Sequence, residues 1–501
     1  MRGSRFSRSR PMQVIAWMLF VCCLGVIVTG YIVGPAKTAH AQDVAEGTAP
    51  AEGETGAPAA EEPALMKPKV GEGDPSTILD RSVSFLGIFF FLALAFAMSN
   101  NRKRIDWRLV AWGVALQLIF AVIIFFIPGG EAAFAGATAA VKKLLEFTDQ
   151  GSGFIFQSFI TNKWEPALVN FTFAVLPTII FFSSLMTLLY HLGVMQRIVY
   201  VFAWLMQRTM RTSGAESLSA AANIFVGQTE APLVIKPFVD RMTMSELMTV
   251  MTGGFATVAG GVMAAYVGML ERFFPDIAGH LIAASVMSAP AALVIGKMMW
   301  PETSTPETSG DLDLHLEKED VNVLDAASRG AAEGLKLALN VGAMLLAFIA
   351  LIALVNYLIG LPFDLATQYG GITIFEQPPT LQGICGYLFS PIAFIMGVPW
   401  DDCLLIGRLL GEKIILNEFV AYADLQSMLA DPGTQLQDRS VIIATYALCG
   451  FANFGSIGIQ LGGIGGIAPD RRQDLAKIAL RAMIAGTIAA FMTGTIAGIL
   501  V

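Results

Sequence analysis

The 501-residue sequence contains very little charge. Only 14 % of its residues are Asp, Glu, Lys or Arg, whereas 55 % are hydrophobic, and the mean hydropathy is +0.63. Soluble domains carry about 25 % charged residues, so this composition excludes an ordinary cytosolic enzyme, a disordered chain and a basic nucleic-acid binder. The apolar runs are about 20 residues long, which suits membrane-spanning helices and is too long for barrel strands. We therefore predict an all-α polytopic protein embedded in a lipid bilayer, with no nucleic-acid partner.

Cysteine and histidine are also scarce. Two of the five cysteines, Cys22 and Cys23, lie in the leading apolar run, and the other three have no metal-like spacing. The four histidines are scattered along the chain. The sequence therefore offers no disulfide framework, metal cluster or nucleophile motif, and we predict that the protein is not an enzyme and holds no cofactor.

The net charge of −8 is confined to a few hydrophilic segments. Residues 1–41 sum to +5, residues 42–75 to −6 and residues 301–325 to −7, so the rest of the chain sums to zero. An acidic balance located in this way says little about ligands.

The N-terminus is typical of a secretory signal. A basic stretch (1–12) precedes an apolar run (13–33), and Ala39-His40-Ala41 fits a small-x-small cleavage site. Because the apolar run is long for a signal, an uncleaved anchor helix is the alternative. Either leaves residue 42 outside the cytoplasm, at the start of an acidic linker that is too poor in apolar residues to order itself.

Eight apolar runs have the length and composition of membrane spans. They are residues 81–98, 107–127, 172–194, 246–269, 279–299, 336–360, 441–466 and 477–500. The Lys and Arg residues after the first and third runs and before the last run place those loops inside, which puts both mature termini outside. Residues 131–147 and 196–215 are amphipathic and are predicted to lie at the membrane interface.

We divide the chain into seven parts on this basis. These are a signal peptide or anchor (1–41), a disordered extracytoplasmic linker (42–79), N-terminal scaffold helices (80–195), an interfacial helix with the first hairpin and following spans (196–300), an acidic cytoplasmic loop (301–330), a scaffold span with an outer loop (331–380), and an interfacial helix with the second hairpin and last two spans (381–501).

Two segments, 216–239 and 401–425, each consist of two short apolar pieces with a polar break. Each piece spans about ten residues, or about 15 Å of helix, and cannot cross about 30 Å of hydrocarbon. We predict that both are helical hairpins that enter and leave on the same side. Such interrupted segments in the two halves of a chain point to the binding site of a transporter.

The break of the first hairpin contains Gln228, Thr229 and Glu230, followed by Pro232, which suits the first turn of a new helix. The second half-helix is expected to begin near Glu230 and to direct its free N–H groups at a ligand. A carboxylate at membrane depth is costly and indicates a functional site. A polar surface loop is the alternative.

Glu418 occupies the corresponding tip of the second hairpin. Its alternative role is an interfacial salt bridge with Arg408 or Lys413. The parallel with Glu230 favours a place in the site.

The seventh and fourth runs are rich in glycine. Asn453 and Ser456 lie in a Gly-rich stretch of the seventh run that predicts local unwinding, with close helix packing as the alternative. In the fourth run, the Thr257 hydroxyl, freed carbonyls and the amide of Asn223 offer oxygen ligands for a weakly bound monovalent cation, although close backbone packing explains the same glycines.

Four segments make the chain recognisable: NIFVGQTEAPLVIKPF (223–238), MTGGFATVAGGV (251–262), NEFVAY (417–422) and ALCGFANFGSIGIQLGGIGGIAPDRRQDLAK (447–477). Together they resemble the concentrative nucleoside transporters, the NupC-like family of cation-coupled nucleoside symporters, over roughly residues 80–500. The resemblance implies a homotrimer in which each protomer has an inverted-repeat transport domain, two helical hairpins and a share of the trimeric scaffold.

The resemblance also implies a set of site residues. Gln228, Thr229, Glu230 and Val262 would meet the nucleobase, Phe451 would line its pocket, and Glu418, Asn453 and Ser456 would bind the ribose. A sodium ion would take the Asn223 side chain, the carbonyls of Val226 and Val258, and the hydroxyl of Thr257, where the family often has serine.

These patterns predict an importer of nucleosides by symport with sodium in the bacterial inner membrane. Proton coupling, with Glu230 or Glu418 as carrier, is the alternative. A membrane-embedded enzyme that uses two glutamates as acid and base, or a channel or receptor-like protein, fits the motifs less well.

Overall fold

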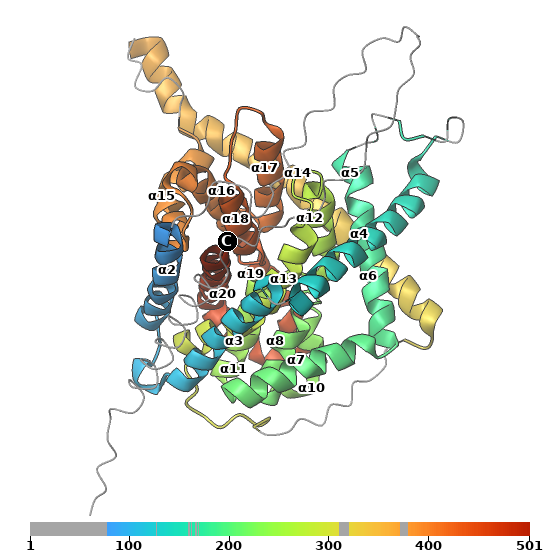
Figure 1. Ribbon diagram of the computed structural model, residues 1–501, viewed down its shortest axis with the longest axis vertical. Coiled ribbons are helices and arrows are strands. Elements are labelled where there is room, and N and C mark those ends of the chain that lie inside the picture. The colour runs from blue at the N-terminus through green and yellow to red at the C-terminus, as the bar shows by residue number, and fades with distance from the viewer. Residues whose placement is uncertain are drawn as a thin grey trace, which may run out of the picture. The chain divides into compact units, whose positions relative to one another are not determined.

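The computed structural model describes residues 78–309, 320–370 and 379–501, apart from residues 127, 159, 160, 162, 166, 167 and 169. The predicted signal peptide or anchor and nearly all of the linker lie outside the described residues. The secondary structure of the described residues is helical (Figure 1), which agrees with the predicted fold class.

The first half of the described chain forms α2 (Ile78–Ala97), α3 (Trp107–Phe126), α4 (Pro128–Phe156), α5 (Phe171–Ala174), α6 (Leu176–His191), α7 (Val194–Met210), α8 (Gly214–Ala222), α9 (Ala231–Val234), α10 (Lys236–Val239), α11 (Met244–Ala256), α12 (Gly260–Leu270) and α13 (Ile277–Met299). The second half forms α14 (Val323–Gly370), α15 (Leu381–Met396), α16 (Cys403–Ile415), α17 (Glu418–Ala430), α18 (Asp438–Leu448), α19 (Phe454–Ile467) and α20 (Arg472–Leu500).

Six of the predicted spans coincide with helical segments that are long and apolar enough to cross a membrane. They correspond to α2, α3, α11 with α12, α13, α14 and α20. The run 172–194 belongs to a pair, α6 and α7, that bends by 79°. The run 441–466 is divided into α18 and α19, each too short to span alone.

Two helices extend well beyond their predicted segments. The segment 131–147 lies within α4, a helix of 29 residues, and α14 begins at Val323, inside the segment assigned to the acidic loop. The amphipathic segment 196–215 is largely α7, as expected.

The helices fall into a buried set and a peripheral set. In α13 and α20, 89 % of the apolar window is buried inside the protein, compared with 28 % in α2 and 22 % in α14. The long helix α14 lies along α6 (Figure 1). Peripheral helices leave large apolar side chains exposed, such as Leu346 of α14, as expected of a surface in contact with hydrocarbon.

Two broken helices meet at the centre of the buried set. The chain is non-helical at residues 257–259, between α11 and α12, and at residues 449–453, between α18 and α19. Gly450 has φ of +146°, and a Cβ there would approach the Phe255 and Ala256 carbonyls closely, so this position requires glycine. The Phe451 N–H donates to the Thr257 carbonyl (3.3 Å). The two breaks therefore lie side by side.

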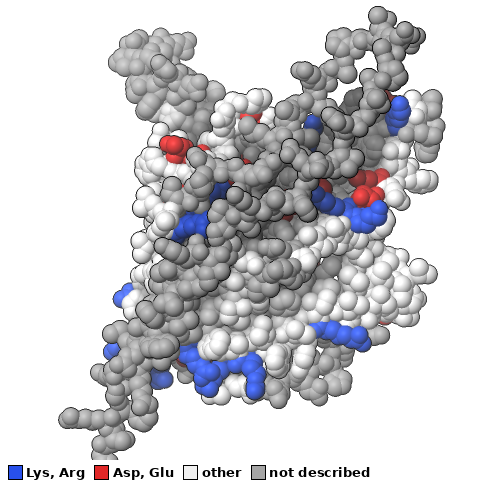
Figure 2. Space-filling view, in the orientation of Figure 1, with Lys and Arg blue, Asp and Glu red and all other residues white. Residues whose placement is uncertain are grey.

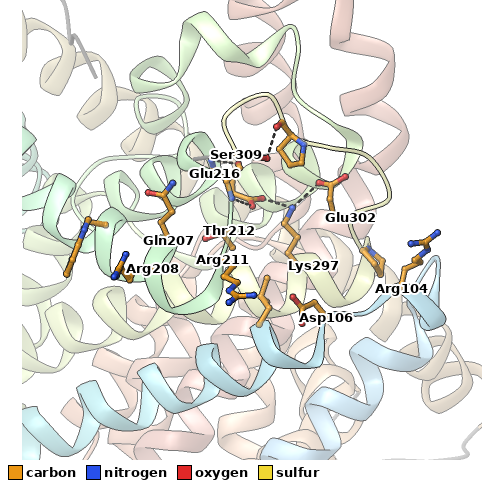
Figure 3. A pocket seen from close by; sticks show the side chains of 15 residues that line it. Arg104, Asp106, Gln207, Arg208, Arg211, Thr212, Glu216, Lys297, Glu302 and Ser309 are labelled. Atoms are coloured by element: carbon orange, nitrogen blue, oxygen red, sulfur yellow. Dashed lines mark hydrogen bonds and ion pairs between the residues drawn. The ribbon is translucent and has the colours of Figure 1, made fainter. Parts of the chain in front are cut away.

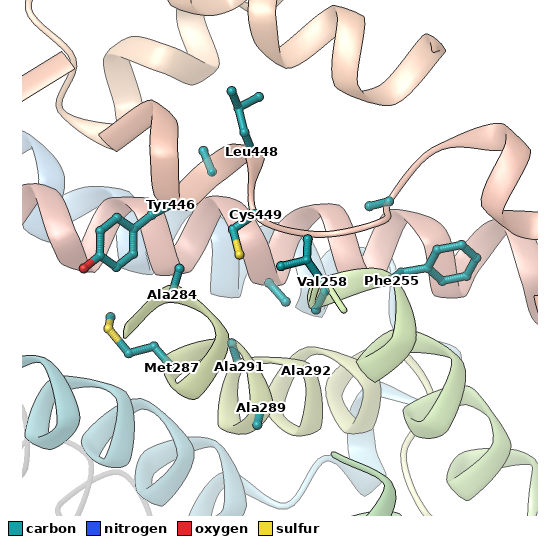
Figure 4. Close-up of a cluster of buried hydrophobic side chains, with 14 of the residues drawn as sticks. Phe255, Val258, Ala284, Met287, Ala289, Ala291, Ala292, Tyr446, Leu448 and Cys449 are labelled. Carbon is teal, nitrogen blue, oxygen red and sulfur yellow. The ribbon is translucent and has the colours of Figure 1, made fainter. Parts of the chain in front are cut away.

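The apolar core continues directly from these breaks. Figure 4 shows Tyr446, Leu448 and Cys449 near Ala284 and Met287 of α13, with Val258 and Phe255 beside them. The breaks are thus fixed by close packing on α13.

Candidate functional site

A chain of buried hydrogen bonds joins α12, α17 and α19. The Tyr266 hydroxyl donates to Glu418 Oε1 (3.1 Å), and Asn453 Nδ2 donates to Glu418 Oε2 (2.9 Å). Asn453 Oδ1 in turn accepts from the backbone N–H of Ser456 (2.8 Å). Glu418 is only 5 % exposed, so both of its oxygens are held inside the protein.

The chain continues into the first interrupted segment. Gln228 Nε2 donates to Ser456 Oγ (3.2 Å), and Gln460 Nε2 donates to Gln228 Oε1 (3.1 Å) and to the Met251 carbonyl (3.1 Å). The structure therefore brings together four residues that the sequence placed in one site: Gln228, Glu418, Asn453 and Ser456.

Local capping fixes two of these residues. Asn417 caps α17 by accepting from the Val420 N–H (2.9 Å), and this places Glu418 in the first turn. Asn453 caps α19 in the same way through Ser456. Both helices thus present their positive N-terminal ends at the Glu418 carboxylate, where an anionic group is stabilised.

Other predicted residues surround this hydrogen-bonded chain. Val262 is buried in the first turn of α12, and Phe451 lies in the break before α19. Thr229 lies against Gly463 of α19, where a Cβ would come within 2.9 Å of the Thr229 methyl.

Glu230 lies outside the chain of hydrogen bonds, and its side chain is exposed. Its carboxylate folds back over Gly227, where a Cβ would clash with it. The helix that follows begins at Ala231, as expected. It is divided into two short helices, because α9 ends at Val234 and α10 begins at Lys236. Pro237 has no N–H to offer the Leu233 carbonyl one turn earlier, so the helix is interrupted.

Two of the predicted cation ligands, Asn223 and Thr257, both contact Gly253 of α11. Asn223, which is completely buried, donates from Nδ2 to the Ser219 carbonyl (3.0 Å), and its Oδ1 has no hydrogen-bond partner in the part of the chain that the structure describes. Gly253 lies beside it, since a Cβ there would be 3.2 Å from Nδ2. The Thr257 hydroxyl donates to the Gly253 carbonyl (2.9 Å). A buried amide oxygen without a donor fits a hard cation, which prefers oxygen ligands.

The two residues predicted to bind the cation through their carbonyls, Val258 and Val226, lie in different segments. Val258 is fully buried in the non-helical segment after α11. Val226 follows α8 in the turn that leads to Gly227, with its N–H bonded to the Ala222 carbonyl (3.0 Å).

Comparisons with known proteins identify this arrangement. Family models described as "Na+ dependent nucleoside transporter N-terminus", "Nucleoside recognition" and "Na+ dependent nucleoside transporter C-terminus" match residues 86–159, 172–273 and 280–498. An uncharacterized transporter of Haemophilus influenzae is 43 % identical over 420 residues, which cover 83 % of this chain and 97 % of that protein. The chain belongs to the Na+-dependent, concentrative nucleoside transporter family.

Relatives with functional names are transporters. Solute carrier family 28 member 3 of Mus musculus is 44 % identical over 83 % of this chain and 58 % of its own length. Sodium/nucleoside cotransporter 1 of Rattus norvegicus is 43 % identical over 84 % of this chain and 64 % of its own length. This chain thus spans about three fifths of the length of these mammalian relatives. That they are transporters agrees with the prediction that the chain is not an enzyme.

Solved transporter structures share the fold. The inward-facing, substrate-bound structure of CNTnw has a TM-score of 0.75 and 40 % identity, covering 84 % of this chain and 98 % of that one. An outward-facing variant of CNTnw gives a TM-score of 0.76 at 40 % identity, covering 85 % and 98 %.

Sequence reasoning missed two side chains of this transporter's hydrogen-bonded chain, Tyr266 and Gln460. Both lie within the fourth and seventh apolar runs, where a buried polar group needs a partner. Gln460 ends the GFANFGSIGIQ motif, so its polarity in an apolar helix was the available signal. Tyr266 gave none, because tyrosine is common in apolar helices.

The alternative role of Glu418 in an interfacial salt bridge is wrong. Arg408 pairs with Glu412 and Asp424 instead, and Lys413 Nζ donates to the Ala447 carbonyl (2.7 Å).

A polar cavity of about 570 Å³ lies elsewhere in the transporter, at the starts of α8 and the loop after α13 (Figure 3). There the Lys297 ammonium pairs with Glu216 (2.7 Å) and Glu302 (3.2 Å) and donates to Ser245 Oγ (3.1 Å). None of the predicted site residues is among the residues that line this cavity.

Proposed function

We propose that this chain is a secondary active transporter that imports nucleosides by symport with sodium. The observation that carries the proposal is the buried chain from Tyr266 through Glu418, Asn453 and Ser456 to Gln228, which joins the two interrupted segments in a member of this family. Burying so many polar groups is costly without a ligand or a complete set of partners.

Glu418 is proposed to bind the ribose. A carboxylate has about four acceptor positions, of which Tyr266 and Asn453 use two. The others suit the vicinal hydroxyls of a ribose, with Asn453 and Ser456 contributing polar contacts. Gln228, Thr229, Glu230 and Val262 are proposed to meet the nucleobase, and Phe451 to cover its face.

Sodium is proposed to bind at the break between α11 and α12. The unpartnered Asn223 Oδ1 supplies one ligand, with the Thr257 hydroxyl and the Val226 and Val258 carbonyls as the others. This ion would hold the non-helical segment in place, and the Phe451 N–H bond to the Thr257 carbonyl would link it to the nucleoside site.

The membrane arrangement follows the same proposal. The segments α8–α10 and α16–α17 are proposed to be re-entrant hairpins that move against a trimeric scaffold. Figure 2 shows Lys and Arg side chains along the lower edge of the view, where α7 and α10 lie in Figure 1, and further Lys and Arg side chains in the upper half, near Asp and Glu. That edge is proposed to face the cytoplasm of a bacterial cell, with both mature termini outside the inner membrane.

Uptake of labelled uridine by proteoliposomes tests the proposal. Sodium and pH gradients are imposed separately, and a panel of nucleosides competes with uridine. We expect saturable accumulation driven by the sodium gradient alone. Accumulation driven only by the pH gradient and indifferent to sodium would replace sodium with the proton as coupling ion, and Glu230 or Glu418 would then be the candidate carrier.

A further inference from the structure

A second cluster of charged groups lies between the two helices of the α16–α17 hairpin. Arg408 Nε donates to Glu412 Oε1 (3.3 Å), and Arg408 Nη2 donates to Asp424 Oδ1 (2.9 Å). One guanidinium thus binds one carboxylate from each helix. The transport scheme above makes no use of these three residues.

Among the described residues, the remaining oxygen of each carboxylate has no donor, and the Glu412 and Asp424 side chains lie within hydrogen-bonding reach of each other. Glu412 Oε2 and Asp424 Oδ2 are both buried without a hydrogen bond among the described residues, and the Glu412 side chain is only 4 % exposed. A carboxylate oxygen can accept but cannot donate. These two orphaned oxygens are therefore satisfied only when a proton or another donor is added.

The charges of the cluster do not cancel. Two carboxylates and one guanidinium sum to −1, and the carboxylates of Glu412 and Asp424 are only 4 % and 18 % exposed, whereas Arg408 is 36 % exposed. An excess negative charge on largely buried carboxylates is disfavoured. Neutralisation by one positive charge would remove this cost. Among the described residues no group of three or more His, Cys, Asp or Glu side chains could hold a metal ion, and Arg408 already occupies one side of the pair.

The cation on α18, Arg439, is bound elsewhere, because it donates to the Gly397 and Val501 carbonyls and to Ser84 Oγ. On α15, Cys385 lies beside Gly411. On α16 itself Lys413 points away, to the Ala447 carbonyl of α18. On α17, Glu418 is held by Tyr266 and Asn453.

Groups on the elements at the ends of α16 are also engaged. Asp402 accepts from the Gln437 N–H (3.0 Å) and from Ser440 Oγ (2.5 Å). The Tyr446 hydroxyl of α18 is hydrogen-bonded to His280 Nδ1 (3.3 Å). A proton is therefore the positive charge that this site can take.

We propose that Glu412 and Asp424 form a one-proton site, in which a proton on one carboxyl group is donated to the orphaned oxygen of the other. The protonated cluster is neutral, and the hairpin that carries it enters an apolar environment more readily than the charged one. The proposal rests on the proposed transport function. It adds a proton dependence located away from Glu418 and the nucleoside.

The test is the pH profile of sodium-driven uridine uptake in proteoliposomes, with equal pH on both sides and a fixed sodium gradient. Wild-type uptake is expected to fall about tenfold per pH unit above the pKa of the pair, because only the protonated fraction moves. The substitutions Glu412→Gln and Asp424→Asn each remove the titration, so each profile becomes flat. The double substitution gives the same flat profile, because a single proton is shared.

Two controls keep the result interpretable. Glu412→Asp retains a carboxyl group and is expected to retain the pH dependence, and Asp401→Asn removes an exposed carboxylate at the start of the same hairpin and leaves the profile unchanged. Uridine-induced protection against thermal unfolding identifies the variants that fold. If only one of Glu412→Gln and Asp424→Asn folds, its pH profile alone tests the proton site.

The outcomes separate the proposals. Sodium-driven uptake by the wild type that is indifferent to pH over about four units, or variants with the wild-type profile, would overturn the proton site and leave the transport function intact. Absence of sodium-driven uptake by the wild type at every pH would instead overturn the transport function, and the proton dependence with it.

Discussion

Glu418 is a buried carboxylate whose position is fixed from three sides. Its own helix begins at this residue, Tyr266 donates from α12, and Asn453 donates from the start of α19. Because these donors come from separate elements, the carboxylate is oriented before any ligand arrives. Preorganisation of this kind would lower the entropic cost of the ribose binding proposed for Glu418.

Replacing Glu418 with Gln tests its role. The amide keeps the shape but removes the charge and turns one acceptor into a donor, so uridine uptake is expected to fall by about tenfold or more. The measurement is the initial rate of uptake over a range of uridine concentrations.

A comparison with deoxynucleosides sharpens this test. Each missing ribose hydroxyl is expected to cost the wild type about 1–3 kcal/mol, and the Glu418→Gln variant much less. Equal discrimination by both proteins would remove Glu418 from the ribose site.

Asn223 gives a prediction for the ion. Asn223→Leu removes the unpartnered Oδ1 and is expected to raise the sodium concentration needed for half-maximal uptake at least about tenfold, since a ligated cation loses a strong oxygen ligand. Asn100→Ala, which changes an exposed asparagine, is the control. An unchanged sodium dependence in Asn223→Leu would place the ion elsewhere.

At the scale of the elements, glycine allows α19 to lie against the first hairpin. A Cβ at Gly463 would crowd Thr229, and a Cβ at Gly254 of α11 would come within 2.7 Å of Gln460 Nε2 and 2.9 Å of the Gln228 Cβ. The glycines therefore set how closely α19 and α11 approach Thr229 and Gln228 of the first interrupted segment. Close packing therefore explains Gly463, whereas Gly462 and Gly466 have open space around them.

Two glycines of α19 form a matched pair for this idea. Gly463→Ala is expected to displace Thr229 and raise the KM for uridine several-fold. Gly466→Ala has open space around the new Cβ and is expected to leave the KM unchanged while stabilising the helix by up to about 1 kcal/mol. Equal effects of the two substitutions on KM would refute a role for the close contact.

The buried Lys297 side chain links three helices through an ion pair and a hydrogen bond. Lys297, near the end of α13, pairs with Glu216 of α8 and donates to Ser245 of α11. Lys297→Met leaves the Glu216 charge buried without compensation, so we expect a loss of about 3–5 kcal/mol in the free energy of unfolding.

The measurement for Lys297→Met is thermal unfolding in detergent. The exposed Lys103→Met is the control, and adding Glu216→Gln to Lys297→Met should recover part of the loss. A double variant no more stable than the single one would show that the charge of Glu216 is not the cause.

At the scale of the whole molecule, the helices divide by how much of their surface other helices cover. Most of the α13 and α20 surface is covered, whereas α2 and α14 leave most of theirs open. The open set leaves a large apolar surface that lipid can cover.

We predict a trimer on the basis of the family resemblance. The native mass in lipid nanodiscs, after subtraction of lipid, is expected to equal three chains. A mass of one chain that still supports uptake would contradict the trimeric scaffold and leave the protomer's own transport site intact.

The sequence by itself determined the solvent and the family, and it named four of the polar residues that the structure joins by hydrogen bonds. A charged fraction of 14 % requires a lipid environment, and few polar residues then remain as candidates in the apolar runs. Gln228, Glu418, Asn453 and Ser456 were found for this reason, because a polar group at membrane depth needs a partner wherever the chain folds.

Only the tertiary structure decided which of these groups bind one another. The Glu418 bond to Tyr266 spans 152 residues, and the bond between Gln228 and Gln460 spans 232. No local pattern encodes such pairings, since they depend on how two broken helices pack side by side. For the same reason only the fold separated Glu230, exposed at the turn, from Glu418, enclosed by three helices.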